Sequence, residues 1–477
     1  MKPKSIVKNS VFNVLYKGLT ALFPFIVTVY VSRVLLPGGV GKVSYANTVV
    51  LYFVTLAALG IPNYGVKIIA QGKTSREQSK DFFELFCINF ISTIICTVAY
   101  YAMISFVPHF QNEPMLYRVM GLLLILNVFN IDWFYQGLEE YAYIATRSLL
   151  VKVLSIVAII LTVKEEQDYV TYALILCLAS AGNYLLNVLH AKKYIVFGDY
   201  KLEFRKHVKP VLVLLASAVA TEIYTMLDTL MLEHFHGEVS VGLYSNSVKV
   251  VRLVYMVVIS VVATFYPRIS SYVKAGEKTK LNELMSQGVK IILLLACPCF
   301  IGLMVVSDVF VPVFFGEAFV LATNTLRILS VLIVVFSVAY FLGHIVLISA
   351  GKESSILKIT LIGALANGLM NSFLIPAYAQ EGAAVASVLS EILVTVLLVM
   401  KSKKYFHVSL GLKFVASVAL SCLVMLCVEL ALHGYADKTP LGLALLIAVG
   451  VVAFFGMTFL TKNELIDMMM KRIRKKR

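Results

Sequence analysis

Apolar runs long enough to cross a membrane recur along this chain of 477 residues, from 11–34 near one end to 441–460 near the other. A helix needs about 20 such residues to cross roughly 30 Å of hydrocarbon. A water-soluble domain would need more polar surface than 60% hydrophobic and 14% charged residues can supply. The alternating ten-residue pattern that is typical of membrane β-barrels is absent. The sequence therefore predicts an all-α polytopic membrane protein.

The hydropathy pattern predicts about 14 transmembrane helices. The pairs 43–61/82–107 and 410–432/441–460 are the clearest, whereas 144–163 is the weakest because Arg147 and Lys152 interrupt it. The predicted spans are 11–34, 43–61, 82–107, 116–137, 144–163, 169–189, 210–232, 241–266, 289–315, 325–350, 356–377, 383–400, 410–432 and 441–460.

The placement of lysine and arginine predicts the orientation of these spans. Basic residues gather at both ends of the chain, in 1–8 and 471–477, and in alternate loops, whereas the loop 164–168 is acidic. This bias follows the positive-inside rule, so we expect both termini in the cytoplasm. Insertion topology explains the net charge of +15 without a nucleic-acid partner. Binding of anionic lipid headgroups by the basic loops is the alternative.

The sequence also argues against several classes of protein. The seven cysteines all lie in apolar spans, so neither disulfides nor a metal site is expected. The longest loops, 190–209 and 267–288, are too short for a catalytic domain, and we predict no enzyme and no catalytic residues. The first apolar run is too long for a cleavable signal peptide and is expected to be a retained helix.

A weak internal repeat predicts how the spans are grouped. Segments 40–47 and 241–246 both place Val-Gly before a Tyr-small-Asn triplet, and chance similarity at helix starts is the alternative. If the copies correspond, spans one to six match spans seven to twelve, an arrangement common in transporters. The predicted parts are an N-terminal six-helix bundle at 1–190, a cytoplasmic linker at 191–209, a C-terminal six-helix bundle at 210–400, and two further helices with a basic tail at 401–477.

Four basic residues inside the spans are candidates for binding an anion. Lys249 and Arg252 share one face of span 241–266 at mid-membrane depth, where a diphosphate would offer several acceptor oxygens. Lys152, near the middle of its span, and Lys17 are further candidates. Pairing of the first two with Glu222 or Glu391, and snorkelling of Lys17 to the interface, are the alternatives.

Three acidic residues, Glu222, Asp228 and Glu391, are the deepest of the second half. A buried carboxylate can bind a proton or Na⁺, which makes them candidates for ion coupling, and a salt bridge to Lys249 or Arg252 is the alternative. On span 43–61, tyrosines and threonines share one face, which suits either sugar binding or ordinary helix packing.

Several short motifs along the chain are more specific than its hydropathy. They are Phe23-Pro24-Phe25, Val31-Ser32-Arg33-Val34-Leu35, Gly38-Gly39-Val40-Gly41, Tyr45-Ala46-Asn47, Gly60-Ile61-Pro62-Asn63-Tyr64-Gly65, Asp228-Thr229-Leu230-Met231-Leu232 and Val241-Gly242-Leu243-Tyr244-Ser245. These motifs resemble those of Wzx-type flippases of polysaccharide repeat units. The likeness covers the whole length, and it is most specific over residues 23–65, which include Arg33 and Asn47.

The resemblance implies the multidrug/oligosaccharidyl-lipid/polysaccharide exporter superfamily, with two six-helix bundles around a central cavity. It implies a bacterial inner-membrane flippase for undecaprenyl-diphosphate-linked oligosaccharides that works by alternating access. Membrane lipids, a polysaccharide polymerase and chain-length machinery would be its partners. No cofactor is expected beyond a coupling H⁺ or Na⁺. A multidrug or organic-cation exporter, a lipid II flippase and, from another class, a polysaccharide polymerase are the alternatives, although mid-membrane cations argue against a drug exporter and short outer loops against a polymerase.

Overall fold

A computed structural model describes residues 6–434 and 438–467, and within these the side chains of 6–23, 217, 220, 221, 223 and 224 are not described. All regular elements of the described residues are helices, which confirms the predicted all-α fold. The contacts divide the chain into two compact units, Met1–Glu233 and His234–Arg477. The predicted boundaries at 190, 209 and 400 stay predictions.

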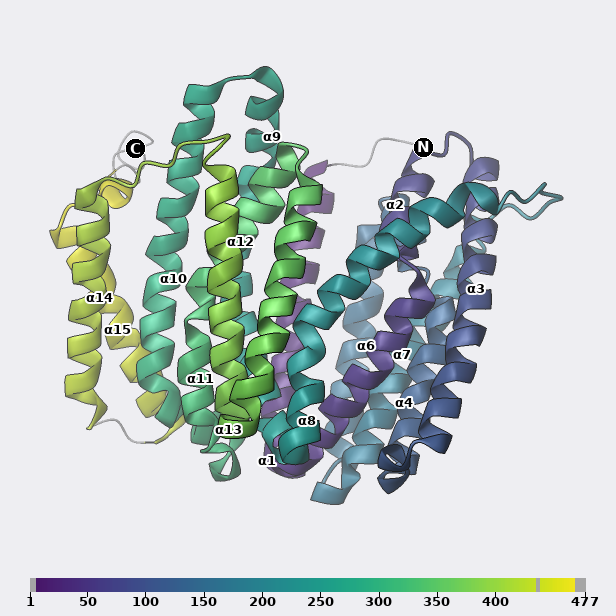
Figure 1. The fold of residues 1–477 in the computed structure, drawn as a ribbon, viewed down its shortest axis with the longest axis horizontal. Coiled ribbons are helices and arrows are strands. Elements are labelled where there is room, and N and C mark those ends of the chain that lie inside the picture. Colours follow the sequence, from purple (N-terminus) through teal and green to yellow (C-terminus); the bar gives the residue numbers. More distant parts are fainter. Residues whose placement is uncertain (1–5, 435–437, 468–477) are drawn as a thin grey trace. The chain divides into compact units, whose positions relative to one another are not determined.

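The first unit contains ten helical elements and the first part of α8 among its described residues (Figure 1). These elements are α1 (Ile6–Ala58), α2 (Ile61–Gln71), α3 (Ser75–Phe106), η1 (Pro108–Asn112), α4 (Pro114–Leu126), η2 (Asn127–Phe129), α5 (Asp132–Gly137), α6 (Tyr141–Thr162), η3 (Glu166–Asp168), α7 (Tyr169–Ala191) and α8 (Arg205–Val262).

The second unit contains the rest of α8 and the elements that follow it. These are η4 (Ala263–Phe265), α9 (Tyr266–Ala275), α10 (Lys278–Phe315), η5 (Glu317–Phe319), α11 (Ala322–Ser330), α12 (Leu332–Tyr340), the π-helix η6 (Phe341–Leu347), α13 (Glu353–Ser402), α14 (Leu412–His433) and α15 (Pro440–Leu460). Helices α10, α14 and α15 contact one another and lie side by side in Figure 1.

Eleven stretches of the described chain are long and apolar enough to cross a membrane, so the predicted number of 14 is not confirmed. Three of the eleven, Pro24–Gln71, Thr225–Ala275 and Glu353–Ser402, are 48 to 51 residues long, and each includes residues of two predicted spans. The long helix in each has a non-helical backbone at one residue, which is Leu36 in α1, Gly237 in α8 or Ala379 in α13. The first stretch has a further break at Leu59 and Gly60, between α1 and α2. A hydropathy count therefore separates helices that the backbone joins through a single kinked residue.

Both copies of the internal repeat follow such a kink. Leu36 has φ 56° and is followed by Pro37, which cannot donate a backbone hydrogen bond, so one half of α1 ends there. Gly237 has φ 72°, a conformation that glycine adopts without steric penalty. The segments 40–47 and 241–246 thus lie near the beginning of the second halves of α1 and α8, and the repeat itself stays a prediction.

The cores of the two units explain how their helices are held. In the first unit, Phe82 stacks on Trp133 with ring centroids 5.7 Å apart, and it also contacts Phe134. This aromatic cluster joins α3 to α5. In the second unit, Phe414 and Phe454 join α14 to α15. Many other apolar side chains are exposed, as expected for helices that face lipid.

Candidate functional site

A tyrosine-bearing face of α1 lies against the acidic residues of α8. The Tyr52 hydroxyl donates a hydrogen bond to the Glu222 backbone oxygen over 3.4 Å, and it interacts electrostatically with the carboxylates of Glu222 and Asp228. The Tyr45 hydroxyl forms a hydrogen bond with the Glu233 side chain. Two of the three predicted coupling acids therefore share one environment, in which Asp228 is buried and Glu222 half-buried.

Two polar clusters continue from this face. His109 of η1 lies 3.2 Å from the Glu233 carboxylate and meets the edge of the Tyr45 ring. Nearby in the sequence, Glu113 accepts hydrogen bonds from Lys42 of α1 and from the Tyr169 hydroxyl of α7. Burial raises the pKa of the Glu113 carboxyl, but these two donors outweigh burial and hold the pKa below its ordinary value.

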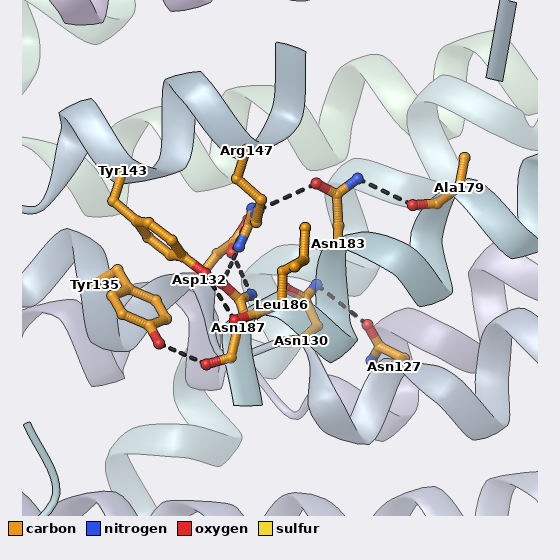
Figure 2. A network of polar contacts seen from close by, with 10 residues as sticks. All are labelled: Asn127, Asn130, Asp132, Tyr135, Tyr143, Arg147, Ala179, Asn183, Leu186 and Asn187. Carbon is orange, nitrogen blue, oxygen red and sulfur yellow. Dashed lines mark hydrogen bonds and ion pairs between the residues drawn. The ribbon is translucent and has the colours of Figure 1, made fainter. Parts of the chain in front are cut away.

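A buried network is centred on Arg147 of α6 (Figure 2). Its Nη2 atom donates to both carboxylate oxygens of Asp132, at 3.0 and 3.2 Å. Its Nε atom donates to Asn183 Oδ1 at 3.1 Å, and Nη1 donates to Asn187 Oδ1. Asn187 in turn donates to Asp132 at 2.7 Å. The guanidinium is neutralised and each of its three nitrogens donates a hydrogen bond, so Arg147 joins α5 and α7 to α6.

Tyrosines surround this network and extend it to the backbone of α7. Tyr143 lies beside the guanidinium with its ring centroid 5.6 Å away, and its hydroxyl donates to the Leu186 oxygen. The Tyr135 hydroxyl donates to the Asn187 oxygen at 2.5 Å. Sequence reasoning missed the network because Arg147 interrupts a weak span and Asp132 lies near a span end. The i, i+4 pair Asn183 and Asn187 is the signal that could have revealed it.

Three of the four predicted cations lack a carboxylate partner within the described residues. Lys152 is half-buried on α6 and has no ion pair there. Lys249, also half-buried on α8, donates to Asn246 Oδ1 over 3.3 Å. Arg252 is exposed on α8, and it interacts electrostatically with the Tyr255 hydroxyl, as Glu391 does. The predicted pairing of Arg252 with a neighbouring acid is not seen in this part of the structure.

The remaining predicted residues are spread over both units. Lys17 lies in α1 but outside the residues whose side chains are described. Arg33 is exposed just before the kink at Leu36, and Asn47 is half-buried just after it. Glu391 is buried on α13, on the same turn as Ser390. Lys17, Lys152, Glu222 and Asp228 belong to the first unit, and Lys249, Arg252 and Glu391 belong to the second.

A group with metal-ligand geometry lies where α3 meets the beginning of α8. The ligand atoms of Asp81, Glu84 and His207 all lie within 4.8 Å of one another. The Lys206 ammonium lies 2.8 Å from Asp81 and 2.9 Å from Glu84, so both carboxylates already have a cationic partner. Burial lowers the pKa of Lys206, but its hydrogen bonds to the two carboxylates outweigh burial and raise it. His207 also contacts the Tyr64 hydroxyl, so this group ties α2, α3 and α8 together.

Comparison with known families and proteins agrees with this architecture. The model of the family described as Polysaccharide biosynthesis protein matches residues 6–273, and the MatE model matches residues 214–373. A protein of Shigella dysenteriae described as an O-antigen transporter is 21% identical over 401 residues, which are 83% of this chain and 100% of that protein.

A Haloferax volcanii protein described as a probable low-salt glycan biosynthesis flippase, Agl15, is 26% identical over 250 residues. That match spans 52% of this chain and 52% of Agl15, so the chain spans about half the length of this relative.

Two solved structures share the fold. A structure of the lipid II flippase MurJ in its inward closed conformation has a TM-score of 0.77 at 13% identity, and the match covers 96% of this chain and 100% of MurJ. An inward-facing multidrug resistance transporter of the MATE family has a TM-score of 0.63 at 14% identity, covering 83% of this chain and 97% of that transporter. At such identities the likeness shows the fold alone.

Proposed function

Because the chain belongs to the Polysaccharide biosynthesis protein family, we propose that it is a flippase for lipid-linked oligosaccharides. Its cargo is an undecaprenyl-diphosphate-linked repeat unit that moves to the outer leaflet of a bacterial inner membrane, where surface polysaccharide is assembled. The main support is the match to the Shigella dysenteriae O-antigen transporter, which runs over that protein's full length. The chain acts as a transporter and not as an enzyme.

The cargo sets the physical problem that such a protein has to solve. A sugar chain with many hydroxyls and a diphosphate cannot enter hydrocarbon without losing its hydrogen bonds to water. A polar path through the protein would replace these bonds while the isoprenoid tail stays in the lipid. Rocking of two helical bundles would open this path to each side of the membrane in turn.

Unpaired cations are the features of this chain that suit the diphosphate. Lys152, Lys249 and Arg252 have no carboxylate partner among the described residues, whereas Arg147 is neutralised by Asp132. A guanidinium can bind two phosphate oxygens at once, which assigns Arg252 the more specific contact. Lys17 is proposed for the same role from its position in the sequence alone.

Ion coupling is proposed for Glu222, Asp228 and Glu391. Support comes from the burial of Asp228 and Glu391. The Tyr52 hydroxyl also interacts electrostatically with Glu222 and Asp228. A polysaccharide polymerase and a chain-length regulator would receive the flipped repeat units. Both termini would lie in the cytoplasm, because the basic loops fall on that side.

Deletion of the gene tests the proposed cargo. We expect surface polysaccharide to be lost while its lipid-linked repeat unit accumulates on the cytoplasmic side. Extraction and mass analysis of undecaprenyl-linked lipids, together with staining of surface glycan, would measure both effects. Intact surface glycan with increased sensitivity to dyes would contradict the proposal and indicate a drug exporter.

Charge-removing variants test the proposed cation site. We expect Lys249→Gln with Arg252→Gln to abolish export in the deletion strain without lowering the amount of protein in the membrane. Lys274→Gln is the matched control, because Lys274 is an exposed lysine of α9 in the same unit. Normal export by the double variant would contradict the proposed role of Lys249 and Arg252 in binding the diphosphate.

A further inference from the structure

A carboxylic acid without a partner is enclosed between three helices of the second unit. The side chain of Glu429, on α14, is fully buried. Among the described residues neither of its carboxylate oxygens has a hydrogen-bond partner. Unpartnered buried carboxylates are rare, because an ionised one loses its hydration without gaining a donor or a counter-charge. Such a group calls for a functional explanation.

Glycines on the two neighbouring helices make room for this acid. A side chain at Gly450 of α15 would overlap the Glu429 carboxylate, and a β-carbon at Gly302 of α10 would lie 3.7 Å from its Oε1 atom. Met425, one turn before Glu429 on α14, is buried beside Gly302. The niche is therefore shaped to hold the carboxyl group but is lined by apolar atoms.

A chain of titratable groups leads from this niche toward the end of α14. His433 lies four residues after Glu429, so the two side chains share a helix face. The His433 Nε2 atom lies 3.0 Å from Asp308 Oδ1 of α10, and Asp308 lies 3.5 Å from Arg327 of α11. All three side chains are partly exposed, at 29% for His433 and 33% for Asp308. They provide a polar connection between the end of the bundle and the region of the buried acid.

We propose that Glu429 is a proton-binding site and that His433 and Asp308 exchange its proton with the side of the membrane at which α14 ends. The predicted topology places this side outside the cell. Glu429 and Gly450 lie on the two helices that follow the predicted twelve-helix repeat, so the site adds to the acids proposed for coupling above. It does not depend on the identity of the transported molecule.

The surroundings favour a proton over a metal cation. Na⁺ and other hard cations require several oxygen ligands, and the niche adds no side-chain oxygen to those of Glu429. On α15 no residue between Pro440 and Leu460 is titratable. On α10 the titratable residues nearest to Gly302 in the sequence are Cys297, Cys299 and Asp308, and on α14 those nearest to Glu429 are Cys422, Cys427 and His433. No basic side chain among the described residues pairs with Glu429. We therefore expect its side chain to be the neutral, protonated acid in this niche.

Infrared spectroscopy of the purified protein in liposomes tests the site. A glutamate in water is ionised at pH 7, so we expect a carboxylic-acid C=O band at that pH that Glu429→Gln removes. Glu317→Gln, at an exposed glutamate of η5, is the matched control and should leave the band unchanged. An identical band in wild type and Glu429→Gln would overturn the proposal.

A second variant distinguishes loss of the proton site from misfolding of the protein. Glu429→Met is apolar and of similar length, and removing an unpartnered polar group should leave thermal stability equal or higher. Loss of folding in Glu429→Met would mean that the carboxyl group holds the helices together, which would also contradict the proposal. The band should be absent in this variant as in Glu429→Gln.

Exchange of the band into D₂O tests the relay. We expect His433→Phe and Asp308→Asn to slow the isotope shift of the Glu429 band at least tenfold relative to wild type. Arg327→Gln should slow it less, because Arg327 contacts Asp308 and not His433. Unchanged exchange rates in His433→Phe and Asp308→Asn would contradict the proposed proton exchange through these two residues. If deletion of the gene left surface polysaccharide intact but the Glu429 band were as expected, the proposed function would be wrong and the proton site would still be supported.

Discussion

Arg147 and Lys152 lie five residues apart on α6 and have opposite surroundings. The Arg147 side chain is 3% exposed and pairs with Asp132, Asn183 and Asn187. Lys152 is half-buried and has no ion pair in the described part of the chain. A buried charge with all its partners stabilises packing, whereas one without a partner is retained at a cost in stability. The contrast assigns a structural role to Arg147 and leaves Lys152 available for an anion.

Substitution of Arg147 tests this contrast. We expect Arg147→Met to lower the free energy of unfolding by about 3 kcal/mol, because it leaves the Asp132 carboxylate without its counter-charge and Asn183 without its donor. Thermal unfolding in detergent can be followed by the fluorescence of Trp133, the single tryptophan of the chain, which is buried next to Asp132. Lys152→Met is the control and should shift the midpoint little. Equal midpoints for the two variants would contradict the structural role.

At the scale of helices, polar side chains decide which faces meet. The tyrosine-bearing face of α1 lies against acids of α8, and Glu113 joins Lys42 of the same helix to Tyr169 of α7 by accepting a hydrogen bond from each. Helix packing in a membrane gains little from the hydrophobic effect, because lipid is as apolar as the helices. Hydrogen bonds and close approach therefore carry more of the specificity, and most of these contacts join residues far apart in the sequence.

The Glu113 cluster predicts a dependence of stability on pH. Because the folded-state pKa of Glu113 is lowered, its contribution is present above the unfolded pKa, about 4.3, and is lost as the pH falls through the folded value. We expect Glu113→Gln to reduce stability by about 1 kcal/mol at neutral pH. The difference from wild type should stay constant down to about pH 4.3 and then shrink.

Thermal midpoints measured from pH 7 to pH 3 would test this expectation. Glu317 is an exposed glutamate whose side chain has no hydrogen bond or ion pair in the described residues. The variant Glu317→Gln should therefore match wild type at every pH. A Glu113→Gln difference that grew on acidification would show that the carboxylate destabilises the fold.

At the scale of the whole molecule, the sequence predicts the class of fold well and the contacts poorly. Apolar length was enough to predict an all-α membrane protein, because crossing hydrocarbon leaves the backbone few other choices. The predicted number of 14 spans is not confirmed, because a single residue such as Leu36, Gly237 or Ala379 joins two helices into one long stretch.

The candidate site was less predictable because its partners come from other helices. Periodicity shows which residues share a face of one helix but not what that face meets. Asp132 and Glu429 both lie near span ends in the sequence, yet Asp132 neutralises Arg147 and Glu429 is enclosed with no hydrogen-bond partner among the described residues. Depth along a single span therefore does not reveal the surroundings of these two acids, whereas the deeper Asp228 and Glu391 are buried as their positions suggest.

The orientation of the whole chain is the remaining prediction, and it follows from the basic loops. If Lys and Arg hold alternate loops in the cytoplasm, alkaline phosphatase fused after Asp168 should be exported and active, and phosphatase fused after Lys404 should stay inactive. A green fluorescent protein at the C-terminus should fluoresce, since the basic tail would remain inside. Active phosphatase after Lys404 would show that the orientation is opposite to the predicted one, and the end of α14 with His433 would then face the cytoplasm. In that case the proton of Glu429 would exchange with the inner side, so this measurement also fixes the direction of the proposed relay.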